Sequence, residues 1–158
     1  MLLYLVRHGK AVAAPDDAER PLTADGVDEM RRIARRLGKL GVRFGAVLTS
    51  PLVRARETAE VLVEVGIADT VDECAGLAPG GTLEQVLGEV VRHCGRGAER
   101  VALVGHEPTL SEWAARLAGA RSFALELKKG GIIGLELPDR PPFEGRATLF
   151  WLTSPKLL

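Results

Sequence analysis

Hydrophobic residues along the chain form two kinds of pattern, short continuous runs and longer stretches with helical spacing. The continuous runs end abruptly at polar residues, which is typical of strands buried on both faces of a parallel sheet. They predict strands at residues 2–6, 46–49, 101–104, 132–137 and 147–152, with a weaker extended segment at 70–73. The last two strands flank the turn-rich stretch 139–145, so we expect them to form a hairpin.

The segments between these runs have the spacing of amphipathic helices. Thr23 resembles an N-cap, and the apolar positions that follow it predict a helix that ends near Gly41. A second helix is expected to begin with Ser50 as its N-cap and Pro51 at its first position, and to run to about Gly66. Further helices are predicted at residues 83–94 and 109–117.

The alternation of strands and helices predicts one α/β domain over residues 1–158, a three-layer sandwich with a largely parallel central sheet and helices on both faces. No apolar run approaches the roughly 20 residues of a membrane span, and the N-terminus lacks the features of an export signal. We therefore expect a cytoplasmic protein. Cys74 and Cys94 are expected to be reduced thiols.

The net charge of the chain narrows the classes of macromolecule that it is expected to bind. The 21 basic and 21 acidic side chains cancel, whereas proteins that bind nucleic acids or anionic membranes normally carry a basic excess. The first 60 residues nevertheless carry a basic excess that the remainder of the chain balances, and most of the basic residues are arginines. Arginine suits phosphate binding, but a general arginine bias would give the same composition.

Polar residues follow three of the predicted strands at the point where each ends: residues 7–9 (Arg-His-Gly), 49–50 (Thr-Ser) and 105–106 (Gly-His). Open α/β sheets bind ligands at this edge. Arg54 is expected in the first turn of the helix after Ser50, where a cation opposes the helix dipole unless an anion lies between them. Two arginines and two histidines beside helix N-termini predict an anion site, most naturally for phosphate.

Taken singly, these residues also have structural explanations. A lone histidine after a strand is more often structural than catalytic, and an arginine at the position of Arg54 is more often a solvated surface side chain. His93 is expected to be structural, because it lies in the last turn of its helix. The sequence has no zinc-ligand spacing, no glycine-rich nucleotide loop and no serine-hydrolase motif.

Four segments together resemble the histidine phosphatase superfamily: LVRHGKA at 5–11, ERPLTADG at 19–26, TSPLVRARETA at 49–59 and LVGHEPTL at 103–110. Within that superfamily they are similar to the SixA-type phosphohistidine phosphatases, a small branch without an inserted helical subdomain. The segments occur in order across nearly the whole chain. The resemblance implies a phosphoglycerate mutase-like fold and a phosphatase that needs no metal or other cofactor, forms a phosphohistidine enzyme intermediate, and removes phosphate from phosphohistidine in a protein.

The resemblance also implies roles for individual residues. His8 corresponds to the nucleophile, Arg7 and Arg54 to the phosphate-binding arginines, and His106 to the second histidine. In the chemistry we expect, neutral His8 attacks phosphorus while its other ring nitrogen donates to a backbone carbonyl. The two arginines and a cationic His106 neutralise the phosphoryl oxygens. Contacts to phosphate or to the pocket rim are expected from Gly9, Arg20, Ser50 and Gly105, although Ser50 is better explained as an N-cap.

No carboxylate matches the proton donor of larger relatives, and Glu73 and Glu107 are only weak candidates. Phosphohistidine has a labile P–N bond and needs no strong acid, which favours it as the substrate. A small phosphomonoester such as a sugar or nucleotide phosphate is the alternative, and a non-catalytic phosphate-binding module is a third reading. The expected partner is a phosphorylated protein such as a histidine phosphotransfer domain. We expect no nucleic acid or membrane partner, and a monomer or weak dimer.

Overall fold

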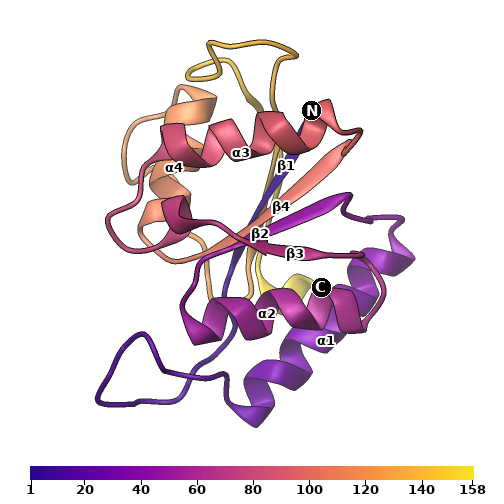
Figure 1. Ribbon diagram of the computed structural model, residues 1–158, viewed down its shortest axis with the longest axis vertical. Helices are drawn as coiled ribbons and strands as arrows, with labels where there is room; N and C mark the ends of the chain where they lie inside the picture. Colours follow the sequence, from indigo (N-terminus) through magenta and orange to yellow (C-terminus); the bar gives the residue numbers. More distant parts are fainter.

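A six-stranded sheet in the order β3-β2-β4-β1-β5-β6 runs through the centre of the computed structural model, which describes residues 1–158 (Figure 1). β1, β2, β3 and β4 are mutually parallel, whereas β5 is antiparallel to β1 and β6 is antiparallel to β5. The predicted largely parallel sheet and its C-terminal hairpin are therefore confirmed. The strands are β1 (Leu2–Arg7), β2 (Ala46–Thr49), β3 (Val71–Glu73), β4 (Arg100–Gly105), β5 (Ile132–Glu136) and β6 (Thr148–Thr153).

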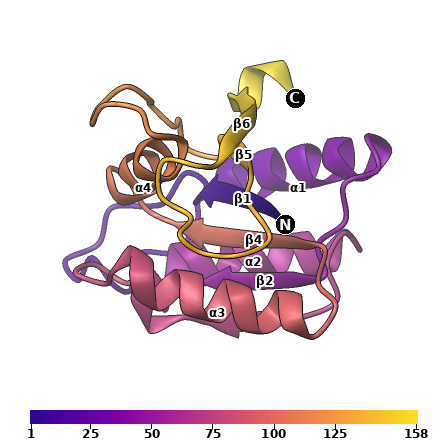
Figure 2. The ribbon, with the colours of Figure 1, turned by 90° about the horizontal axis from the view of Figure 1, so that it is seen from above.

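Two helices cover each face of the sheet (Figures 1 and 2), which confirms the predicted three-layer sandwich. α1 (Ala24–Lys39) and α2 (Val53–Glu64) lie on one face, and α3 (Leu83–Gly95) and α4 (Thr109–Ala118) lie on the other. Two short 3-10 helices complete the fold, η1 (Ala75–Leu77) and η2 (Pro155–Leu157). None of the helices has the length and apolar character required to span a membrane.

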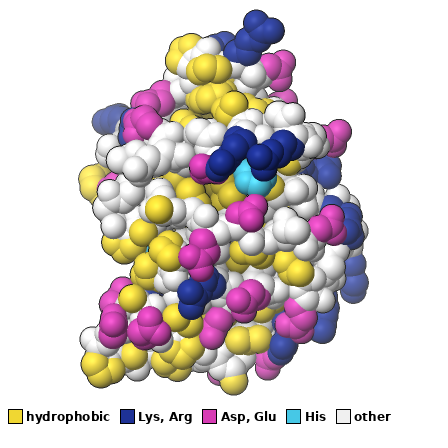
Figure 3. Space-filling view, viewed as in Figure 1, with side chains coloured by type: hydrophobic (Ala, Val, Ile, Leu, Met, Phe, Trp, Pro, Cys, Tyr) yellow, Lys and Arg dark blue, Asp and Glu magenta, His cyan; other side chains and the backbone are white.

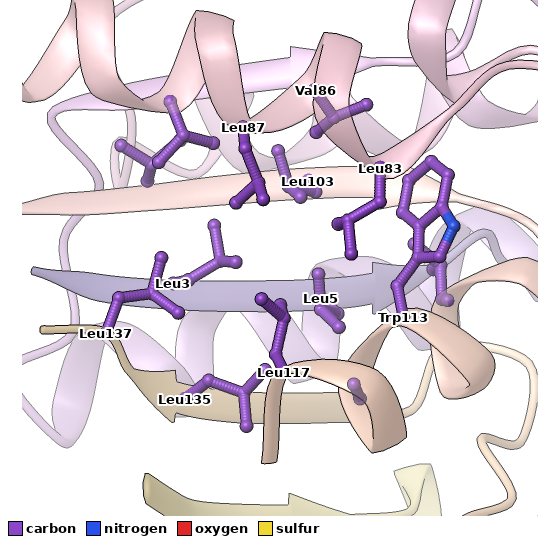
Figure 4. Close-up of a cluster of buried hydrophobic side chains, with 14 of the residues drawn as sticks. Leu3, Leu5, Leu83, Val86, Leu87, Leu103, Trp113, Leu117, Leu135 and Leu137 are labelled. Carbon is purple, nitrogen blue, oxygen red and sulfur yellow. The ribbon is translucent and has the colours of Figure 1, made fainter. Parts of the chain in front are cut away.

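The two faces of β1 serve two different hydrophobic clusters. Successive side chains of a strand point to opposite faces, so Leu3 and Leu5 enter the cluster beneath α3 and α4 (Figure 4), while Tyr4 and Val6 enter the cluster beneath α1 and α2. Burial of each such side chain stabilises the fold by roughly 1.5–3 kcal/mol. The continuous apolar run of β1 thus makes a rigid support for the residues that follow it.

Both cysteines are free thiols, as expected. The predicted N-cap of α1 is also confirmed, because the Thr23 hydroxyl accepts a hydrogen bond from the Gly26 N–H at 2.9 Å. The prediction that Ser50 caps α2 is wrong. The N-cap is Leu52, whose backbone is extended (ψ 138°) and whose side chain makes no capping hydrogen bond. The helix starts later than expected because the Val53 N–H donates to the Ala18 carbonyl in the loop after β1. The Ser50 hydroxyl instead accepts from the Leu52 N–H at 3.3 Å, before the first residue of the helix.

Candidate active site

The carboxyl ends of β1, β2 and β4 lie at one edge of the sheet, where the arrows of β1 and β4 point in Figure 2. Arg7 is paired with Gly105 in the register of β1 and β4. The His8 N–H donates to the Gly105 carbonyl at 3.1 Å, and the Ser50 N–H donates to the Val104 carbonyl at 2.9 Å. The predicted meeting of three distant segments is therefore confirmed.

His8 is buried, with 7% of its surface exposed. Its Nδ1 lies 2.7 Å from the Gly9 carbonyl oxygen, which only accepts hydrogen bonds, so Nδ1 carries the proton. Nε2 therefore keeps its lone pair, and the Arg54 Nε donates to it at 3.3 Å. Burial lowers the pKa of His8 to about 4, and the positive charges of Arg54 and Arg7 act in the same direction. His8 is thus neutral at pH 7 with an unprotonated nitrogen beside a guanidinium.

The turn after His8 is attached to α2. The Gly9 N–H donates to the Thr58 hydroxyl at 3.1 Å, and that hydroxyl donates to the Arg54 carbonyl at 2.7 Å. A side chain at Gly9 would place its Cβ 2.9 Å from Met30 Cγ, so the close packing requires glycine. Thr58 was not identified from the sequence. The available signal is its place four residues after Arg54, on the same face of the helix.

Arg54 is only 6% exposed, so the solvated surface arginine is ruled out. Its Nη1 donates to the Asp17 carbonyl at 2.6 Å and its Nη2 to the Asp17 carboxylate at 3.0 Å. Hydrogen bonds from Arg20 and Arg54 lower the pKa of Asp17, which suits it to hold arginines and not to donate protons. Asp17 was not identified from the sequence, because nothing in its polar loop sets it apart from the neighbouring acidic residues.

Arg20 holds the loop after β1 and makes no hydrogen bond to either site histidine. Its Nε donates to the Val12 carbonyl at 2.8 Å, and its Nη1 donates to the Asp17 carboxylate at 2.9 Å. It is therefore connected to Arg54 through Asp17. Gly105 was expected to contact phosphate or the pocket rim. It is instead buried at the end of β4, where its carbonyl accepts a hydrogen bond from the His8 N–H.

His106 faces His8, with ring centroids 5.1 Å apart and an interplanar angle of 53°. Its Nε2 lies 2.8 Å from the Ser50 hydroxyl. Burial lowers the pKa of His106 to about 4, with further lowering by Arg54 and Arg7. In the free protein the His106 ring is therefore neutral at pH 7, and the cationic form expected during phosphoryl transfer stays a prediction for the ligand-bound state. The pKa is low because burial removes the ring from water and because two guanidinium groups lie near it.

Arg7 reaches across to the segment before β5. Its Nη1 donates to the Leu127 carbonyl at 2.7 Å, whereas its buried Nε has no partner within the chain. The buried His106 Nδ1 is likewise unpartnered. Buried polar groups are normally hydrogen-bonded, so these two atoms indicate a place for a polar ligand. No group of three His, Cys, Asp or Glu side chains is arranged to hold a metal ion.

The two candidate proton donors are engaged elsewhere. Glu73 is exposed at the end of β3 and lies 3.4 Å from Arg56. The carboxylate of Glu107 accepts from the Ser111 hydroxyl at 2.6 Å and from the Leu127 N–H at 3.1 Å. Neither glutamate hydrogen-bonds to His8 or His106. His93 lies in the last turn of α3 with its Nε2 3.5 Å from the Asp72 carboxylate, in keeping with the structural role expected for it.

Comparison with known proteins identifies the family. The sequence profile of the histidine phosphatase superfamily (branch 1) matches residues 3–133. The chain belongs to the histidine phosphatase superfamily. That membership agrees with the resemblance drawn from the four sequence segments and with the mixed sheet flanked by four helices.

Two relatives and a solved structure match nearly the whole chain. An uncharacterised protein of Picosynechococcus sp. is 42% identical over 100% of this chain and 99% of its own. Phosphohistidine phosphatase SixA of Escherichia coli is 27% identical over 98% of this chain and 94% of its own. A solved structure of the protein histidine phosphatase SixA complexed with tungstate superposes with a TM-score of 0.87 at 28% identity and covers 99% of both chains. The compact fold of SixA is thus shared.

The lowered histidine pKa values predict how the stability of this histidine phosphatase depends on pH. Between pH 6.5 and 4 the unfolded chain binds protons at His8 and His106 that the folded chain does not bind. The free energy of unfolding should therefore fall as the pH is lowered through this window, by up to about 1.4 kcal/mol per pH unit for each histidine. Urea unfolding at pH 7, 6 and 5 measures this slope.

The matched variant in this experiment is His8→Gln/His106→Gln, which should show a shallower loss than the wild type. Ser122→Ala serves as the control, because it changes an exposed residue that carries no titratable group, and its slope should equal that of the wild type. Equal slopes for the wild type and the double variant would show that the two site histidines titrate normally.

Proposed function

We propose that residues 1–158 act as one phosphatase domain that removes phosphate from phosphohistidine in a protein, without a metal ion, through a phosphohistidine intermediate on His8. The observation that carries the proposal is the single unprotonated nitrogen of His8, which the Gly9 carbonyl fixes as Nε2 and which accepts a hydrogen bond from Arg54. Similarity over full length to a protein named phosphohistidine phosphatase supports the same substrate class.

In the first step, the His8 Nε2 lone pair forms a bond to phosphorus as the P–N bond to the substrate histidine breaks. Arg54 and the unpartnered Nε–H of Arg7 neutralise the phosphoryl oxygens. The substrate imidazole leaves as a neutral base when its other nitrogen already carries a proton. The exchange is between two similar imidazole nitrogens, so it needs no strong acid. This explains why a site without a placed carboxylic acid suits this substrate.

In the second step, water attacks phosphorus and His8 leaves as the neutral imidazole. His106 is neutral in the free protein and can therefore take a proton from the attacking water. A phosphoryl group bound between the two rings favours the protonated form of His106 electrostatically. The Gly9 carbonyl holds the proton on His8 Nδ1 throughout, which keeps Nε2 as the reacting atom.

The shape of the site supports a substrate histidine carried on a protein. Between β3 and α3 the chain forms only the short helix η1 (Ala75–Leu77) and a turn, and this segment is too short for an enclosing subdomain. No observation favours the small phosphomonoester. The non-catalytic reading is disfavoured because both histidines and both arginines are in place. The proposed partner is thus a phosphorylated protein such as a histidine phosphotransfer domain, acted on by a monomer or weak dimer.

A substrate panel tests the proposal. The value of kcat/KM for a phosphohistidine protein should exceed the values for p-nitrophenyl phosphate and for sugar and nucleotide phosphates by about 100-fold or more. EDTA should not reduce the rate, and vanadate should inhibit. Preference for a sugar or nucleotide phosphate would establish the alternative function, and a strict metal requirement would contradict the mechanism.

Ser50→Ala is expected to lower kcat/KM by about fivefold. The hydroxyl holds the His106 ring at 2.8 Å, and loss of such a hydrogen bond costs about 1 kcal/mol. Ser122→Ala removes an exposed hydroxyl and should keep wild-type activity. If Ser50→Ala were as active as Ser122→Ala, Ser50 would have no part in positioning His106.

A further inference from the structure

Four of the five lysines of this chain line one cleft. Its volume is about 550 Å³, and it is formed by Ser154 and Pro155 with the charged residues Arg7, Lys10, Glu29, Lys128, Lys129 and Lys156. The lining thus includes five cationic residues and one carboxylate, in a protein whose net charge is zero. Arg7 belongs both to this cleft and to the candidate active site, so the two adjoin at this residue.

The cleft is attached to the backbone of the site itself. The Gly130 N–H, directly after Lys129, donates to the carbonyls of Arg7 at 3.1 Å and His8 at 3.2 Å. Gly130 has φ +72°, and an added Cβ would lie 3.1 Å from Met30 Sδ, so this tight turn requires glycine. The lysine-bearing turn is therefore held at a fixed position relative to the reacting histidine.

The opposite wall of the cleft is attached to α1. The Pro155 carbonyl accepts a hydrogen bond from Arg32 Nη2 at 2.7 Å, which places Lys156 beside that helix; the C-terminal turn lies beside α1 in Figure 2. Lys10 extends from the chain after His8 and lies 3.3 Å from the Glu29 carboxylate. Both walls thus rest on elements of the folded core.

Two of the four lysines have no partner in the free protein. Lys10 pairs with Glu29 and Lys128 pairs with Glu126, whereas Lys129 and Lys156 are exposed and form no ion pair. By contrast, the face covered by α3, β3 and α2 shows acidic and basic side chains interspersed (Figure 3). The larger cavity, about 630 Å³, lies around residues 136–148 at the turn between β5 and β6 and contains none of the site residues.

We propose that this lysine cleft, beside Arg7, binds an acidic segment of the phosphoprotein substrate next to its phosphohistidine. The proposal rests on the proposed function and adds a specificity determinant to it. The phosphoryl group contacts Arg7 and Arg54, and carboxylates of the flanking segment form ion pairs with Lys129 and Lys156. A protein with no overall charge gains selectivity from such a local field, because complementary charges steer the correct partner and disfavour basic ones.

The test compares two phosphohistidine peptides, one flanked by Asp and Glu and one by Asn and Gln. The wild type should prefer the acidic peptide by about tenfold in kcat/KM at low ionic strength, and about 0.5 M salt should remove most of the preference. Lys129→Glu/Lys156→Glu should abolish or reverse the ratio. Lys39→Glu/Arg140→Glu makes the same charge change outside the cleft and should keep the ratio. Equal rates on both peptides, or an unchanged ratio in Lys129→Glu/Lys156→Glu, would overturn the proposal.

A binding measurement separates this proposal from the proposed function. Fluorescence anisotropy of an unphosphorylated peptide of Asp and Glu should give a Kd at least about tenfold weaker for Lys129→Glu/Lys156→Glu than for the wild type. If no phosphohistidine peptide is hydrolysed but this difference is found, the cleft stands and the proposed substrate fails. If phosphohistidine is hydrolysed and both proteins bind the acidic peptide equally, the substrate stands and the cleft fails. Tighter wild-type binding of a single-stranded RNA oligonucleotide than of the acidic peptide would also overturn the proposal.

Discussion

Replacement of His8 with alanine is expected to lower kcat/KM for phosphohistidine hydrolysis by at least about 10⁴-fold, because it removes the atom that forms the covalent intermediate. In the wild type, the buried ring presents Nε2 with its lone pair, and the neighbouring guanidinium cannot act as a nucleophile. Single-turnover kinetics with purified variant should show no phosphate release above the uncatalysed rate.

His93→Ala is the matched control for this variant. It also removes an imidazole, but from the last turn of α3, and it should retain the wild-type rate. A thermal unfolding curve shows whether each variant is folded. A folded His8→Ala protein that still releases phosphate at the wild-type rate would rule out His8 as the nucleophile.

Arg54→Ala is expected to lower kcat/KM by about 10³-fold, since it removes a preorganised charge from the developing phosphoryl oxygens. Arg54→Lys should recover only part of this loss. The guanidinium donates from three nitrogens at once, to His8 Nε2 and to both the carbonyl and the carboxylate of Asp17. A single ammonium group on a flexible stem cannot reproduce that arrangement.

Arg56 provides the control on the same helix. Its side chain is 42% exposed and lies 3.4 Å from Glu73, so Arg56→Ala and Arg56→Lys should keep activity within about twofold of the wild type. Full steady-state curves measure kcat and KM separately for all four variants. Wild-type kcat in Arg54→Ala with only KM raised would show that Arg54 binds substrate without stabilising the transition state.

The fold and the principal residues could be predicted because their signals are local. The run from Leu2 to Val6 is apolar at every position because two clusters cover β1, and this makes the strand easy to identify. β1 ends abruptly at Arg7 and His8, and β4 ends in a similar way. These two strand ends were sufficient to predict that the polar residues following them meet at one edge of the sheet. Parallel pairing then brings these residues together without any further information.

The remaining parts of the site depend on tertiary contacts that leave no local pattern. Ser50 before proline has the sequence of an N-cap, but the contact between Val53 and the Ala18 carbonyl moves the start of α2, and the hydroxyl turns to His106. Asp17 acquires its role only because its loop folds back onto Arg54. The neutral state of His106 likewise follows from burial, which the sequence does not display.

The central claim is that phosphate passes through His8 Nε2, and trapping the intermediate tests it most directly. After rapid mixing of the wild type with a phosphohistidine protein and quenching in base, we expect phosphate on the enzyme that is stable in base and labile in acid. ³¹P NMR and peptide mapping should place it on Nε2 of His8, and His8→Ala should show none. Phosphate release by the wild type with no phosphoenzyme, or with phosphate on a different residue, would rule out His8 Nε2 as the atom that carries the phosphoryl group.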